Sequence, residues 1–203
     1  MPSIYDLKPR FQALLRPLTT HLAGQGVTAN QVTLAAGAGS LLLGGLLALL
    51  PEQRWLFWLI PLWMFLRMAL NAIDGMLARE FGQQSRLGAY LNELCDVVSD
   101  AALYLPFALV AGVWSPLVVG VVVLALLSEY AGVMAPLVGA PRRYDGPMGK
   151  SDRAFVFGVL ALGVATGVLP GGALNLVLAL VAALLLLTLR NRVKQGLAHA
   201  DDR

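Results

Sequence analysis

Long apolar runs recur along almost the whole chain, and they limit the folds that it can adopt more than any other feature. Six of them cover residues 31–50, 55–80, 87–112, 116–139, 152–169 and 173–190. Each run is close to the ~20 residues that a helix needs to cross a lipid bilayer. Because 58% of the 203 residues are hydrophobic and only 13% are charged, a soluble globular domain is excluded. The sequence predicts an all-α integral membrane protein with six transmembrane helices.

The segment before the first run, residues 1–26, has a different pattern. Apolar side chains recur in it at helical spacing, with basic and polar residues between them. This pattern predicts an amphipathic helix that lies in the membrane interface and is broken near Pro9 and Pro17. We therefore expect an interfacial segment at 1–26, a six-helix transmembrane domain at 27–190 that holds the functional site, and a cytoplasmic tail at 191–203.

Charged residues indicate the orientation of the chain and exclude some functions. With the amino-terminus in the cytoplasm, 13 of the 15 Lys and Arg residues lie on the cytoplasmic side, while Arg54 lies opposite and Arg67 lies within a span. The basic residues stand at the ends of spans rather than on one soluble face, so the net charge of +3 does not indicate nucleic-acid binding. The single cysteine, Cys95, excludes a disulfide framework and a cysteine-based metal centre.

Small residues follow one another along the first span. Ala36, Ser40 and Gly44 are four residues apart. This stripe allows a second helix to approach closely, either within the same chain or in a dimer. A homodimer and membrane lipid are the partners that we expect from these features.

Polar residues interrupt the second and third spans, although each charge inside hydrocarbon costs about 2.5–3.5 kcal/mol on insertion scales. Asn71 and Asp74 are three residues apart on the second span, and Asn92, Asp96 and Asp100 follow at four-residue intervals on the third. Each set therefore lies on one helical face, and a short loop joins the two spans as an antiparallel pair. We expect the two faces to meet near the cytoplasmic end. Their hard oxygen atoms favour Mg²⁺, Mn²⁺ or Ca²⁺.

These spans resemble the signature of the CDP-alcohol phosphatidyltransferase family, Asp-x-x-Asp-Gly-x-x-Ala-Arg, followed after eight residues by Gly-x-x-x-Asp-x-x-x-Asp. The matching residues, with the spacing intact, are Asp74, Gly75, Ala78, Arg79, Gly88 and Asp96. Asn71 and Asn92 depart from the pattern, because they stand where the family has its first and third aspartates. The segment Thr28–Thr33 is similar to the family's Pro-Asn-x-x-Thr but lacks the proline.

The resemblance implies a reaction, a metal ion and a set of residue roles. The reaction is transfer of a phosphatidyl group from CDP-diacylglycerol, or a similar CDP-lipid, to an alcohol acceptor with release of CMP, at the cytoplasmic face of a bacterial inner (plasma) membrane. Mg²⁺ or Mn²⁺ would be bound by Asn71, Asp74, Asn92 and Asp96. Asp96 would also be the base that activates the acceptor hydroxyl, and Asp100 is the alternative base. The substrate-binding residues would be Asn30, Thr33, Gly75, Ala78, Arg79, Gly88, Lys150 and Arg153.

Some of these residues also have purely structural interpretations. Lys150 and Arg153 open the fifth span, where the resemblance implies basic residues that bind a phosphate on the acceptor, but they also fit the positive-inside pattern. Arg67 would form an ion pair with Asp74 or Asp100, or contact the substrate. A buried hydrogen-bonded partner is the simpler interpretation of Glu129, and a direct role is the alternative.

Two other functions stay open. One is a small ion-coupled transporter that uses Asp74, Asp96 and Asp100 as a relay, although transport gives no reason for the spacing of the glycines and Arg79. The other is a catalytically degenerate family member kept as a binding or assembly subunit, which the two asparagines favour. Release of CMP by the purified protein separates all three.

Overall fold

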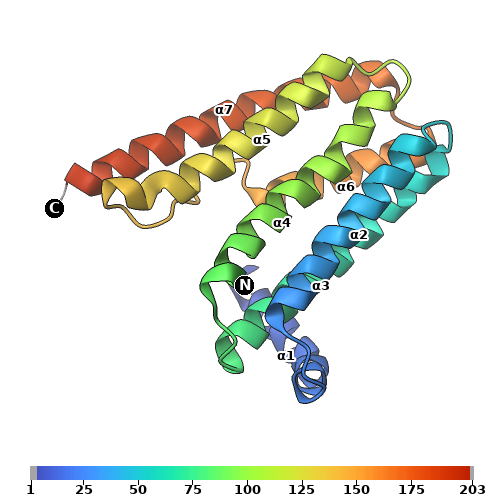
Figure 1. Ribbon diagram of the computed structural model, residues 1–203. Helices are drawn as coiled ribbons and strands as arrows, with labels where there is room; N and C mark the ends of the chain where they lie inside the picture. The colour runs from blue at the N-terminus through green and yellow to red at the C-terminus, as the bar shows by residue number, and fades with distance from the viewer. Residues whose placement is uncertain (1–3, 202–203) are drawn as a thin grey trace. The chain divides into compact units, whose positions relative to one another are not determined.

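A computed structural model describes residues 4–201, and within them the chain is helical with no β-strand (Figure 1). Short connections and three short 3₁₀-helices separate the α-helices. The elements are α1 Ile4–Gly24, α2 Ala29–Leu49, η1 Arg54–Trp58, α3 Leu59–Glu80, α4 Arg86–Tyr104, η2 Leu105–Leu109, α5 Ser115–Met134, η3 Ala135–Val138, α6 Lys150–Thr166 and α7 Gly171–Asp201. The prediction of an all-helical protein is confirmed.

Four segments among the described residues are long and apolar enough to cross a membrane. They are Ala29–Leu49, Arg54–Glu80, Ser115–Val138 and Gly171–His199, and they correspond to the first, second, fourth and sixth predicted spans. The third and fifth correspond to α4 and α6. Charged residues interrupt α4, and α6 has 17 residues. Membrane crossing by these two helices stays a prediction.

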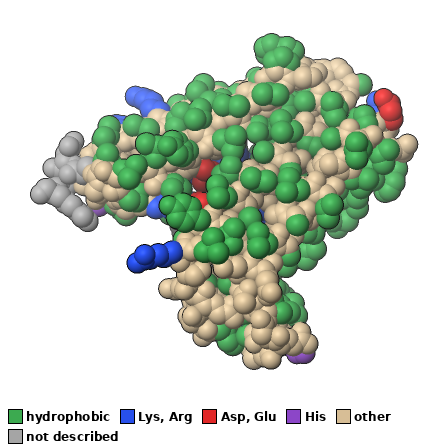
Figure 2. Space-filling model, viewed as in Figure 1, with side chains coloured by type: hydrophobic (Ala, Val, Ile, Leu, Met, Phe, Trp, Pro, Cys, Tyr) green, Lys and Arg blue, Asp and Glu red, His purple; other side chains and the backbone are tan. Residues whose placement is uncertain are grey.

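The surface of these helices is rich in apolar side chains. Leu42 on α2, Leu62 on α3 and Leu176 on α7 are 75%, 67% and 76% exposed. Figure 2 shows that hydrophobic side chains cover much of the visible face, with few charged groups among them. A helix that is apolar on its exposed face as well as on its packed face is typical of a segment surrounded by lipid.

Helix α1 continues without interruption through Pro9 and Pro17, so the predicted break is wrong. A proline removes one intrahelical hydrogen bond, but tertiary packing can offset that loss. Here Leu15 and Leu22 of α1 pack against a buried cluster formed by α2 and α3. The interfacial location of α1 stays a prediction.

The chain divides into two compact units. Unit 1 contains the described residues up to Leu42 together with Leu62–Ser99, and unit 2 contains Leu43–Pro61 and the described residues from Asp100 onward. Helix α4 supplies residues to both. The core of unit 1 is a cluster of Ala29, Val32, Ile73, Met76 and Leu77. In unit 2, α5 packs along α7, and Tyr104 stacks on Phe157 with ring centroids 3.8 Å apart.

The stripe of small residues on α2 is used for packing inside the chain. Ala36 and Ser40 are buried, and the Ser40 hydroxyl accepts a hydrogen bond from Trp63 Nε1 at 2.9 Å in unit 1. In unit 2, Gly44 lies so close to the carbonyl of Ala102 that a side chain there would collide with it. Of the two interpretations of the stripe, the structure shows the one within the chain, and the homodimer stays a prediction.

Candidate active site

The amino-terminal end of α2 is held by two glutamine side chains. Thr28 and Gln31 form a capping box, in which Gln31 N donates to Thr28 Oγ1 at 3.2 Å and Thr28 N donates to Gln31 Oε1 at 2.9 Å. Gln83, in the loop after α3, accepts from Ala29 N at 2.7 Å and donates to the Val27 carbonyl at 3.3 Å. The loop between the two motif helices therefore fixes the start of α2.

Helix α2 then places Thr33 against the motif on α3. The Thr33 hydroxyl donates to Asp74 Oδ2 at 2.8 Å, and both residues are buried. A carboxylate in such a place needs hydrogen-bond donors, because an unsatisfied buried charge is costly. Thr33 thus fixes one oxygen of the Asp74 carboxylate, a contact that the sequence did not indicate.

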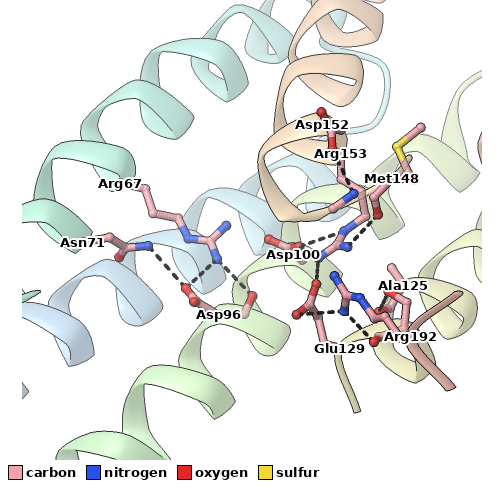
Figure 3. A network of polar contacts seen from close by, with 12 residues as sticks. Arg67, Asn71, Asp96, Asp100, Ala125, Glu129, Met148, Asp152, Arg153 and Arg192 are labelled. Atoms are coloured by element: carbon pink, nitrogen blue, oxygen red, sulfur yellow. Dashed lines mark hydrogen bonds and ion pairs between the residues drawn. The ribbon is translucent and has the colours of Figure 1, made fainter. Parts of the chain in front are cut away.

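Asp96 on α4 is held by two residues of α3 (Figure 3). The guanidinium of Arg67 donates from Nη2 to Asp96 Oδ1 at 3.1 Å and to the main-chain carbonyl of Asp96 at 2.9 Å. The Asn71 amide donates to the same Oδ1 at 3.3 Å. The expected partners of Arg67 were Asp74 or Asp100, and Asp96 is a contact that the spacing did not indicate. The two oxygen-bearing faces do meet, as the four-residue spacing predicted.

The motif glycines lie where neighbouring side chains pass close to a helix. A Cβ atom at Gly75 would lie 2.9 Å from Nη2 of Arg79, so the Arg79 side chain folds back over this glycine. At Gly88 a Cβ atom would lie 2.7 Å from Asn30 Oδ1 and 2.9 Å from Ser85 Oγ. Ser85 caps α4, since its hydroxyl accepts from Gly88 N at 2.9 Å. A side chain at either glycine would displace the ends of these neighbouring side chains.

The remaining motif positions lie on the same two helices. Asn92 and Glu93 are half-buried on α4, and Ala78 is half-buried on α3, where it packs against the core of unit 1. Ala78 therefore has a packing contact that its small size allows. The predicted residues Asn30, Thr33, Asn71, Asp74, Gly75, Ala78, Arg79, Gly88, Asn92 and Asp96 all belong to unit 1.

The donor set of unit 1 fits one hard divalent cation. Asp74 and Asp96 supply carboxylate oxygens, and Asn71 and Asn92 are able to supply amide carbonyl oxygens, which suit Mg²⁺ or Mn²⁺. Within residues 4–201, no three His, Cys, Asp or Glu side chains come together as a group that would hold a metal. Because Asn71 and Asn92 are neutral, these four residues bring two negative charges rather than four.

A second charged cluster lies in unit 2 and contains the other predicted residues. Arg153 is 1% exposed, and its Nη2 contacts Asp100 Oδ2 and Glu129 Oε1, both at 3.0 Å. Asp100 is buried as well, and its Oδ2 accepts a hydrogen bond from Arg153 Nη2. Lys150 is half-buried at the start of α6. Glu129 is the hydrogen-bonded partner that the simpler interpretation predicted.

Sequence reasoning missed two contributions to this architecture. The capping box of Thr28 and Gln31 has a readable signal, the pair Thr-x-x-Gln before an apolar run. Arg192 lies beyond the predicted end of the last span, but it is 2% exposed and its Nη1 contacts Glu129 at 3.3 Å. Its burial has no signal in the sequence, because a basic residue after a span fits the positive-inside pattern equally well.

Known proteins are similar to this chain in sequence. The inner membrane protein YnbA of Escherichia coli is 48% identical over 200 residues, which cover 98% of this chain and 99% of that protein. A phosphatidylinositol phosphate synthase of Streptomyces avermitilis is 31% identical over 161 residues, covering 76% of this chain and 64% of the synthase.

A solved structure has the same fold. The crystal structure of Mycobacterium tuberculosis phosphatidylinositol phosphate synthase in complex with manganese and citrate matches with a TM-score of 0.74 at 24% identity, over 92% of this chain and 91% of that one. The family model described as CDP-alcohol phosphatidyltransferase matches residues 26–197, which include both halves of the motif. The predicted resemblance is therefore confirmed, and this chain belongs to the CDP-alcohol phosphatidyltransferase family.

Proposed function

We propose that the protein transfers a phosphatidyl group from CDP-diacylglycerol, or a similar CDP-lipid, to an alcohol acceptor and releases CMP. The observation that carries this proposal is that residues of three helices, far apart in the sequence, meet through the motif. Thr33 of α2 contacts Asp74 of α3, and Asp96 of α4 contacts Arg67 and Asn71 of α3. Family membership supports the same reaction and favours it over ion-coupled transport.

Asp96 is the base in this proposal. Its carboxylate takes the proton of the acceptor hydroxyl, the hydroxyl oxygen forms a bond to the phosphorus that carries the diacylglycerol, and the bond from that phosphorus to the CMP oxygen breaks. Arg67 and Asn71 orient Asp96, because both donate to its Oδ1. Asp100 is the weaker candidate, since it is buried against Arg153.

One divalent ion, Mg²⁺ or Mn²⁺, would be held by Asp74 and Asp96 with the amide oxygens of Asn71 and Asn92, and when bound it would supply positive charge for the diphosphate and the departing CMP. Thr33 fixes the carboxylate of Asp74 for this purpose. The structurally similar mycobacterial synthase was crystallised with manganese, which supports a metal of this kind.

The remaining residues of the motif bind the CDP-lipid in this proposal. Gly75 and Gly88 add no side chain of their own to the helix surface. The side chain of Arg79 lies over Gly75, and that of Asn30 lies over Gly88. Lys150 and Arg153 belong to the acceptor side. The active site faces the cytoplasm of a bacterial inner membrane, which is supported by the distribution of basic residues, the four apolar helices and the similarity to an inner membrane protein.

The test is CMP release by the protein purified in detergent, with CDP-diacylglycerol, Mn²⁺ or Mg²⁺ and a panel of alcohols. We expect CMP and a new phospholipid in equal amounts, loss of both with EDTA, and recovery when the metal is returned. The variant Glu80→Gln is a matched control, since Glu80 is an exposed carboxylate on α3 that pairs with Arg16. CDP-lipid binding without CMP release from any acceptor would instead identify a degenerate family member.

A further inference from the structure

A single carboxylate lies among three arginine side chains in unit 2. Glu129 Oε1 contacts Arg153 Nη2 at 3.0 Å, and Glu129 Oε2 contacts Arg192 Nη1 at 3.3 Å and Arg142 Nη2 at 3.8 Å. Figure 3 shows Glu129 between Arg153 and Arg192, which come from α6 and α7. Glu129 is therefore shared by three guanidinium groups, and one of them, that of Arg153, also contacts Asp100 Oδ2 at 3.0 Å.

Burial makes this anion necessary. The side chains of Arg153 and Arg192 are both 1% exposed, and that of Glu129 is 12% exposed. Buried guanidinium groups without a counter-charge are strongly destabilising, so Glu129 is needed as the counter-charge of Arg192 and, together with Asp100, of Arg153. The side chain of Arg142 is 31% exposed, so the cluster is open to a ligand at that point.

Several guanidinium groups around one anion form the arrangement that holds a phosphate, because each fork donates charge-assisted hydrogen bonds to its oxygens. Here the protein's own carboxylate already accepts those bonds. A phosphate that entered the cluster would lie next to Glu129, and it would have to break the contacts of Glu129 or accept repulsion between like charges. The cluster therefore resembles a phosphate-binding site in which a carboxylate of the protein takes the place of the phosphate.

An uncharged hydroxyl does not meet this obstacle. Arg192 Nε is buried and has no hydrogen-bond partner among the described residues. A hydroxyl oxygen is able to accept from such a donor, and its hydrogen is able to bond to a carboxylate oxygen, without displacing any charge. The cluster therefore suits a neutral polar ligand better than an anionic one, because a neutral ligand adds no charge beside Glu129.

We propose that Glu129 is a specificity-determining residue that restricts the acceptor to an uncharged alcohol and rejects an alcohol that carries a phosphate. The proposal rests on the proposed function only in assigning the acceptor to the side of Lys150 and Arg153. The charge argument itself rests on the side chains of the cluster, which are Arg142, Arg153, Arg192, Glu129 and Asp100.

The experiment measures phosphate binding without any CDP-lipid, so that it does not depend on catalysis. Wild type and the isosteric variant Glu129→Gln are purified in detergent, and their thermal unfolding is followed as inorganic phosphate replaces chloride at constant ionic strength. We expect no stabilisation of the wild type by millimolar phosphate. Glu129→Gln should bind phosphate at least about tenfold more tightly, because one like charge is gone and the guanidinium donors are available.

A matched control removes a different carboxylate of the same unit. Glu52 is exposed in the turn between α2 and η1, and Glu52→Gln also replaces a carboxylate of unit 2 by an amide. We expect Glu52→Gln to behave as the wild type. Phosphate binding that rises equally in both variants would show a general effect of net charge and contradict the proposal.

The acceptor experiment then separates this proposal from the proposed function. With the wild type, glycerol should support CMP release at least about tenfold better than glycerol 3-phosphate, and Glu129→Gln should narrow that ratio. A wild type that binds phosphate as tightly as Glu129→Gln overturns the proposal. A wild type that prefers the phosphate ester also overturns it, and this result does not require the variant to fold. Absence of CMP release with every acceptor counts against the proposed function alone, and the phosphate titration still decides the role of Glu129.

Discussion

Arg67 holds both the side chain and the main chain of Asp96. Its Nη2 donates to Asp96 Oδ1 at 3.1 Å and to the Asp96 carbonyl at 2.9 Å, and the Arg67 side chain is only 6% exposed. Because Arg67 binds both the carboxylate of Asp96 and the main-chain carbonyl behind it, Arg67 restricts the rotation of the carboxylate and also compensates its charge. Arg67 is therefore a positioning residue for the base that we propose.

Replacing Arg67 by lysine tests this positioning role. Lysine keeps the charge but presents a single compact ammonium in place of the planar fork, so we expect kcat for CMP release to fall by about tenfold. The KM for the CDP-lipid should change little, whereas a substrate-binding Arg67 would raise it. Steady-state kinetics distinguish the two, and Arg16→Lys, at the exposed pair with Glu80, is the control that should leave both constants unchanged.

Removing either motif carboxylate should abolish the reaction. We expect Asp74→Asn and Asp96→Asn to release no measurable CMP while keeping the helical circular dichroism and the elution volume of the wild type. Each variant loses a charge that would hold the metal or accept the proton, but its amide preserves the shape of the side chain. Near-normal activity in either variant would show that our register of the motif is wrong.

The asparagines predict an unusual response to metal. The Asn71 amide lies 3.3 Å from Asp96 Oδ1, so Asn71→Asp would bring two carboxylates together. Without metal, repulsion should lower the midpoint of thermal unfolding below that of the wild type. Addition of Mn²⁺ should reverse the order, because the added carboxylate strengthens cation binding.

Titration of Mn²⁺ by isothermal calorimetry checks the same argument. We expect one ion per wild-type chain and at least about tenfold higher affinity in Asn71→Asp, since one more ligand carries a charge. Asn175→Asp is the control, because Asn175 lies in α7 and bonds to the carbonyl of Gly112. Two tightly bound ions in the wild type would refute the charge argument.

The sequence was sufficient to predict those parts of the fold and site that depend on hydrophobic composition and on the helical period. Apolar runs predicted the helices, and the three- and four-residue intervals placed Asn71 and Asp96 on faces that meet. Spacing was not sufficient to choose between neighbouring partners. Asp96 and Asp100 share a face of α4, but Asp96 pairs with Arg67 and Asp100 pairs with Arg153. Which basic side chain reaches which carboxylate is decided by packing.

Local rules also failed where tertiary contacts outweigh them. Pro9 and Pro17 predicted a broken helix, and α1 is continuous because its apolar side chains pack on a core. Gln83 stands in a loop with no periodic pattern, so nothing in the sequence indicated that it holds the start of α2. Arg192 resembled an ordinary basic residue after a span until its contact with Glu129 was known.

The hydroxyl of Thr33 should matter for the stability and metal affinity of unit 1. Thr33→Val keeps the shape of the side chain but leaves Asp74 Oδ2 without this donor, and we expect a loss of about 1–3 kcal/mol in the free energy of unfolding. Thr33→Ser keeps the hydroxyl and should retain most of the wild-type stability. The comparison is Thr166→Val, since the exposed Thr166 hydroxyl bonds only to carbonyls of its own helix among the described residues. Equal effects at both positions would show that the bond to Asp74 contributes nothing particular.

The last prediction separates structural and substrate roles for Arg153. Its guanidinium compensates Asp100 and Glu129, so Arg153→Met leaves two buried carboxylates without that partner and should cost about 3–5 kcal/mol of stability. The double variant Arg153→Met with Asp100→Asn should recover part of this loss, because one of the uncompensated charges is gone. Lys150→Met is the control at the start of the same helix, where the side chain is half-buried. If Arg153 served only to bind a substrate phosphate, the single variant would raise the KM for the acceptor and leave thermal unfolding unchanged, and the second substitution would rescue nothing.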